Sequence, residues 1–91
     1  MSSNSSAVDA IGVPAALEGL AEELIEAAHA SLKAARALRG ENPTPAKQYN
    51  ELEKLVEEYT DVYFYAQELG LEPNLALLEQ KRKRFKERID G

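Results

Sequence analysis

The chain has 91 residues, 16 acidic and 11 basic side chains, a formal net charge of -5 and no cysteine. One domain is expected at this length, and a domain this small buries only about 60 to 65 % of its unfolded surface, which favours self-association. The lack of cysteine excludes disulfides, thiolate zinc sites and thiol nucleophiles, and the acidic balance argues against nucleic acid polymers as partners.

The first residues carry no recognisable targeting signal. The segment from Met1 to Ser6 is polar and rich in serine, without the basic and apolar regions of a signal peptide. No window approaches the ~18 consecutive apolar residues that cross a bilayer, so no membrane partner is expected. We therefore expect a cytoplasmic protein in which residues 1–11 form a flexible leader and residues 12–91 form a single all-α domain.

The first predicted helix runs from Val13 to Arg39. Pro14 suits a first helical turn, and Gly40 is a C-terminal stop. Apolar residues recur at spacings of three and four, which is typical of a helix face and not of a strand. These residues are Leu17, Leu20, Leu24, Ala28, Leu32 and Ala35.

Two further helices follow a loop at residues 41–45, where prolines bias the preceding residues away from helix. The second is expected from about Lys47 to Leu69, and the third is expected to begin at Pro73. The apolar stripe of the second helix comprises Leu52, Leu55, Val56, Tyr59, Val62, Tyr63, Ala66 and Leu69. That of the third comprises Leu75, Leu78, Phe85 and Ile89. The chain is thus predicted to be an all-α, three-helix subunit that forms helical bundles by homo-oligomerisation.

Two matched pairs of carboxylates are the strongest candidate for a site. Glu23 and Glu26 lie at the border of the first apolar stripe, and Glu58 and Asp61 stand in the same relation to the second. If the two helices pair antiparallel, as a short loop favours, the four carboxylates converge, and protonation or a bound cation must relieve their repulsion. An all-oxygen site suits Mg²⁺ or Mn²⁺, whereas the alternative is a pair of solvated acidic flanks.

Aromatic and basic residues are candidates for binding a phosphate ligand. Tyr65 lies one turn beyond Asp61, where it could contact a ligand or pack in a core. Six of the 11 basic residues stand at positions 81–88. Lys81 and Arg84 share a face and are the candidates for phosphate oxygens, and the alternative is a solvated helix end that complements the helix dipole.

His29 allows a different chemistry. Glu26 and His29 have a Glu-x-x-His spacing, and two copies of it with Glu58 from each partner helix would make a di-iron site in a symmetric dimer. A third interpretation is a non-catalytic helical interaction module, in which the carboxylates have no ligand.

The acidic runs EELIE at 22–26 and EEYTD at 57–61 resemble the E-E-x-x-E and E-x-x-D motifs of the MazG-like all-α nucleoside triphosphate pyrophosphohydrolases. The resemblance extends over residues 13–90. It implies cleavage between the α and β phosphates of a nucleoside triphosphate, giving the monophosphate and pyrophosphate, by a Mg²⁺-dependent dimer or tetramer. The implied metal ligands are Glu23, Glu26, Glu58 and Asp61. The implied substrate-binding residues are Tyr65, Lys81 and Arg84. A carboxylate could also activate the attacking water, with Glu23 as first candidate and Glu22 or Glu26 as alternatives.

Overall fold

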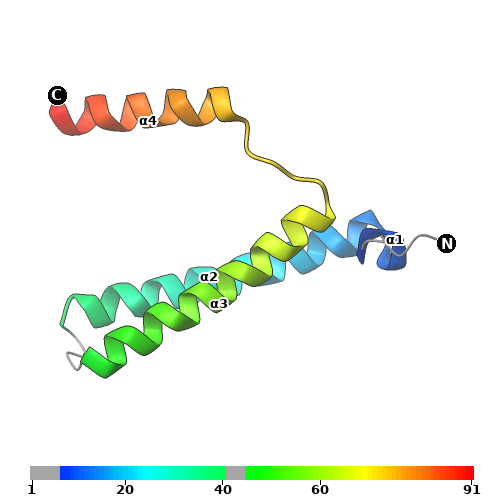
Figure 1. Cartoon of the computed structure of the whole chain (residues 1–91), viewed down its shortest axis with the longest axis horizontal. Helices are drawn as coiled ribbons and strands as arrows, with labels where there is room; N and C mark the ends of the chain where they lie inside the picture. Colours follow the sequence, from blue (N-terminus) through cyan, green and yellow to red (C-terminus); the bar gives the residue numbers. More distant parts are fainter. Residues whose placement is uncertain (1–6, 41–44) are drawn as a thin grey trace.

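The structure is a computed structural model that describes residues 7–40 and 45–91. Its helices are α1 (Ala7–Ile11), α2 (Val13–Leu38), α3 (Pro45–Glu68) and α4 (Leu75–Asp90). Within these ranges there is no strand, so the predicted all-α class is confirmed. The helices α2 and α3 lie side by side as a hairpin, and a short extended segment leads from α3 to α4 (Figure 1).

A short helix that was not predicted precedes the three predicted helices. The last five residues of the predicted leader form α1, which packs against α2 and α3. Gly12 separates α1 from α2 with a φ of 87°, a conformation that other residues rarely adopt. Residues 1–6 and the predicted loop at 41–44 lie outside the described residues, whereas Pro45 begins α3.

Local sequence accounts for the junction between α3 and α4. Gly70, with a φ of 71°, donates its N–H to the Gln67 carbonyl at 3.0 Å, and Leu71 donates to the Ala66 carbonyl at 2.8 Å. This is the Schellman pattern that ends a helix at glycine. The Asn74 side chain accepts from the Leu77 N–H at 2.9 Å, so α4 begins at Leu75 rather than at Pro73.

Small residues, not leucines, form the contact between α2 and α3. The most buried residues of α2 are Ala16, Ala30, Ala34 and Ala37. Because alanine keeps the helix axes close, α3 lies along this alanine flank, and Gln48 donates to the Ala37 carbonyl across it at 3.2 Å. Most of the leucines in the predicted stripe are exposed, Leu17 by 47 % and Leu24 by 49 %, whereas Leu20 is half-buried.

The last helix stands away from the hairpin. In the described part of the chain, α4 packs against none of the other helices (Figure 1). The radius of gyration is accordingly 17.2 Å, whereas a compact domain of this length would have about 12 Å. None of the described helices has an apolar stretch that could cross a lipid bilayer.

Candidate functional site

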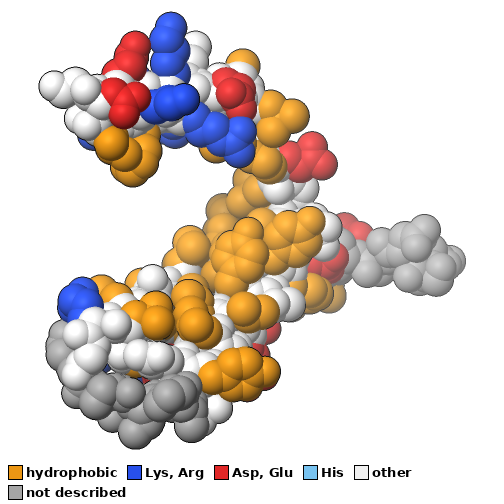
Figure 2. Space-filling view, turned by 60° about the vertical axis from the view of Figure 1, so that its left-hand side comes forward, with side chains coloured by type: hydrophobic (Ala, Val, Ile, Leu, Met, Phe, Trp, Pro, Cys, Tyr) orange, Lys and Arg blue, Asp and Glu red, His pale blue; other side chains and the backbone are white. Residues whose placement is uncertain are grey.

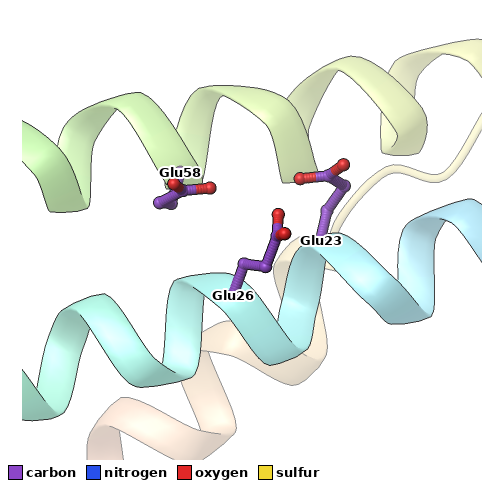
Figure 3. A group of neighbouring side chains, drawn as sticks. All are labelled: Glu23, Glu26 and Glu58. Atoms are coloured by element: carbon purple, nitrogen blue, oxygen red, sulfur yellow. The ribbon is translucent and has the colours of Figure 1, made fainter.

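Three of the four predicted carboxylates converge between α2 and α3. Glu23 and Glu26 project from α2, and Glu58 projects from α3 toward them (Figure 3). One oxygen of each carboxylate lies within 4.8 Å of an oxygen of each of the others. We call these three residues the carboxylate cluster. The convergence follows from the hairpin, because an antiparallel pairing places the middle of α2 beside the middle of α3.

The Glu23 carboxyl is only partly exposed to solvent. Its Oε2 atom is buried and has no hydrogen-bond partner among the described residues. Burial raises the pKa of Glu23, and a hydrogen bond with Glu26 together with the negative charges of Glu26, Asp61 and Glu58 raises it further. Burying a carboxylate oxygen without a hydrogen-bond partner is unfavourable in free energy. A proton or a cation bound at this atom would reduce that cost.

Asp61 and Lys54 lie at the edge of the carboxylate cluster. Asp61 is exposed and is not one of the three converging groups, although its charge acts on Glu23. Lys54 Nζ lies 3.7 Å from Glu58 Oε1, and the two side chains are 57 % and 14 % exposed, respectively. Lys54 is thus an i,i+4 partner of Glu58 and brings a positive charge beside the carboxylates.

An open cavity of about 440 Å³ adjoins the carboxylate cluster. It is lined by Glu26, His29, Ala30, Lys33, Asn50, Glu51, Lys54 and Glu58. Ligand pockets commonly have volumes of about 300 to 1,000 Å³. Lys33 and Lys54 therefore place two positive charges at the cavity beside the carboxylates. Neither lysine is a candidate on the sequence pattern alone, although Lys33 lies two turns beyond Glu26 on the same helix face.

Tyr65 packs against a glycine of α2. A Cβ atom built on Gly19 would lie 2.5 Å from Tyr65 Cε1, so the ring fills the space that this glycine leaves. The ring also meets Phe64 edge to face, with centroids 5.4 Å apart. The half-buried Tyr65 thus has a packing role between α2 and α3 that accounts for its position.

Lys81 and Arg84 lie on α4, apart from the carboxylate cluster. They line a shallow basic depression with Glu87 and Arg88. Because α4 does not pack on the hairpin in the described chain, one subunit does not bring these two residues to the carboxylates.

The donor set of the carboxylate cluster fits a hard divalent cation. It offers only carboxylate oxygens, which Mg²⁺ and Mn²⁺ prefer. It also contains the buried Glu23 oxygen that lacks a partner among the described residues. A cation there would offset the mutual repulsion of the three groups and leave the lysines at the cavity free to meet an anionic ligand.

Comparison with known proteins gave no match to a family model, a curated protein or a solved structure.

Proposed function

We propose that this chain is a cytoplasmic, Mg²⁺-dependent nucleoside triphosphate pyrophosphohydrolase that works as a homo-oligomer and releases pyrophosphate and a nucleoside monophosphate. The observation that carries the proposal is the convergence of Glu23, Glu26 and Glu58 around a buried, unpartnered carboxylate oxygen. The resemblance of the two acidic runs to MazG-like motifs supplies the reaction class, and the cavity beside the carboxylate cluster supplies room for a phosphate chain.

Each group of the site has a role in this proposal. The three carboxylates, with Asp61 at their edge, would hold Mg²⁺, which neutralises phosphate charge and lowers the pKa of an attacking water. Lys33 and Lys54 would hold phosphate oxygens at the mouth of the cavity. Glu23 is the first candidate to accept a proton from the water, with Glu22 or Glu26 as alternatives. Lys81 and Arg84 do not reach the carboxylates within one subunit and have no role in this proposal.

The test is pyrophosphate release from a panel of canonical and modified NTPs and dNTPs with Mg²⁺ or Mn²⁺. The proposal predicts turnover of at least one nucleotide. It also predicts that Glu58→Gln abolishes release, since a metal ligand is lost. Glu57→Gln is the matched control, because it makes the same change in charge at an exposed neighbouring position. No turnover of any nucleotide at high enzyme concentration would count against the proposal.

One observation favours a second candidate. His29 lines the same cavity as Glu26 and Glu58, and a di-iron carboxylate site uses these two residue types, glutamate and histidine. This candidate predicts stoichiometric iron after aerobic loading with Fe²⁺, and loss of that iron in His29→Ala. Pyrophosphate release that is unaffected by His29→Ala would favour the pyrophosphohydrolase.

A further inference from the structure

The hairpin exposes two apolar stripes beside its own helix contact. The stripe on α3 comprises Tyr49, Leu52, Val56, Tyr59 and Tyr63, all exposed. The stripe on α2 includes the exposed residues Val13, Leu17, Leu24 and Leu38. The α3 stripe follows the three-and-four spacing of a helix-packing face. The α2 residues are spaced by 4, 7 and 14 positions, which places them on one face of their helix at about 100° per residue. Together we call them the apolar face of the hairpin.

Both stripes lie on one side of the hairpin. Around each helix axis, at about 100° per residue, the residues of both stripes lie on one side of the α2–α3 contact. Glu26 on α2 and Lys54 on α3 lie on the other side. The carboxylate cluster therefore opens on the side opposite to the apolar face. Figure 2 shows hydrophobic side chains gathered on the hairpin below α4 and basic side chains gathered on α4, with an open space between them. An apolar cavity of about 610 Å³, lined in part by Tyr59, Tyr63, Leu71 and Leu75, lies at the end of the hairpin from which α4 departs.

One face of α4, exposed except at the half-buried Leu78, matches the stripe on α3. It comprises Leu75, Leu78, Arg82, Phe85 and Ile89. Its successive spacings of three, four, three and four residues are those of the α3 stripe, and each stripe is about 21 Å long at the helical rise. Arg82 is the one charged residue at the centre of this face, and it forms a 2.6 Å salt bridge with Glu79 within α4. A polar residue at such a position fixes the register of helix pairing.

The amount of exposed surface indicates a whole second chain rather than closure of α4 on its own hairpin. The accessible surface is 7224 Å² for a 10.0 kDa chain, whereas a compact monomer of that mass has about 5,200 Å². The difference of about 2,000 Å² per chain reaches the range of obligate dimer interfaces. Closure of α4 alone would cover one stripe and leave the leucines of α2 in solvent.

We propose that a second copy of this chain occupies the space between α4 and the hairpin. The apolar faces of the two hairpins then meet, and each α4 packs along the α3 stripe of the partner, centre to centre. Charge favours the exchange, because residues 1–80 contain 14 acids and 5 bases, whereas residues 81–91 contain 2 acids and 6 bases. This dimer is a specific form of the self-association in the proposed function. Its formation does not require that the chain hydrolyse nucleotides.

Disulfide formation between two differently substituted chains tests the exchange. Because the chain has no cysteine, Val56→Cys and Arg82→Cys each introduce one thiol, at the centres of the two stripes. One chain carries a mass tag, and the two are mixed and oxidised. The proposal predicts a disulfide-linked pair of unlike chains, and it predicts little such product when Gln80→Cys, on the opposite side of α4, replaces Arg82→Cys. A third chain carries both substitutions. If the two single-thiol chains give no mixed product, and the doubly substituted chain forms a disulfide within a monomer, the proposed exchange is wrong.

Sedimentation measures the same interface without thiols or nucleotide. Wild-type protein should sediment at twice the chain mass of 10.0 kDa. Phe85→Gln combined with Ile89→Gln should weaken the dimer at least about tenfold, because two apolar side chains per chain lose their burial. Ala76→Gln, on the opposite side of α4, should leave the dimer unchanged. A wild-type monomer at micromolar concentration, or a monomer that binds phosphatidylserine vesicles through α4, would contradict the proposal. Loss of pyrophosphate release with an intact dimer would affect only the proposed function.

Discussion

The Glu23 carboxyl combines partial burial, a hydrogen bond to another carboxyl and three negative neighbours. Its buried Oε2 atom has no hydrogen-bond partner among the described residues, and each of these surroundings raises its pKa. An ionised Glu23 is therefore unfavourable in the absence of a cation. Such a group favours the binding of a divalent ion, because the repulsion that destabilises the unliganded chain is relieved when the ion binds.

Glu23 should make the stability of the metal-free protein depend on pH. Because its pKa is raised in the folded state, that state holds the proton more tightly than the unfolded chain does. The stabilising effect of the protonated group is present near or below its unfolded pKa of about 4.3, and is lost as the pH rises through the folded pKa. Glu23→Gln should therefore raise the Tm of metal-free protein more at about pH 8 than at about pH 4. Thermal unfolding with the exposed Glu22→Gln as control measures this, and an equal shift at both pH values would argue against it.

Gly19 provides a second test at the scale of single residues. An alanine there should destabilise the fold by about 1 to 3 kcal/mol through its clash with the Tyr65 ring, which exceeds the gain of about 1 kcal/mol in helix propensity. In a Tyr65→Ala background, where the ring is absent, the same change should become stabilising. Urea unfolding of the four proteins gives both values, and the same sign in both backgrounds would contradict the contact.

At the scale of helices, α2 packs α3 through alanines and leaves its leucines for another surface. A helix with two apolar stripes can use either one for its neighbour within the chain. The alanine flank allows the helix axes to come close, which brings carboxylates from both helices within reach of one another.

Enlarging a buried alanine should disrupt this arrangement. Ala34 is 3 % exposed, so Ala34→Leu should force α2 and α3 apart and cost about 1 to 3 kcal/mol. Ala21→Leu adds the same volume at an exposed position of the same helix and should have little effect on the free energy of unfolding. Chemical denaturation compares the two, and equal effects would show that the alanine flank is not the contact.

The helices and most of their ends could be predicted from the sequence because proline, glycine and apolar periodicity act locally. Three carboxylates of the site could be predicted for the same reason, since residues three apart share a helix face and the hairpin brings the faces together. Three features could not be predicted from the sequence: that α2 packs through its alanine flank, that Lys33 lies beside the carboxylates, and that α4 stands apart from the hairpin. Each depends on which surfaces meet in space, and periodicity does not distinguish a stripe buried within the chain from one left exposed.

At the scale of the whole molecule, the accessible surface of 7224 Å² exceeds the roughly 5,200 Å² of a compact monomer of this mass. If association provides the missing burial, stability must depend on concentration, because only the associated state is favoured by mass action. The Tm of the wild-type protein should therefore rise over a hundredfold range of concentration. The Tm of the variant with Phe85→Gln and Ile89→Gln should be lower and less dependent on concentration, and differential scanning calorimetry measures both. A Tm independent of concentration in the wild type would contradict the association.

Electron paramagnetic resonance of Mn²⁺ measures directly whether the carboxylate cluster binds a divalent cation. The wild type and Glu57→Gln should bind Mn²⁺ with the same affinity. Glu58→Gln, which has the same net charge as that control, should lose the binding because one of the three converging oxygen donors is replaced by an amide. Equally weak binding by all three proteins would contradict the claim.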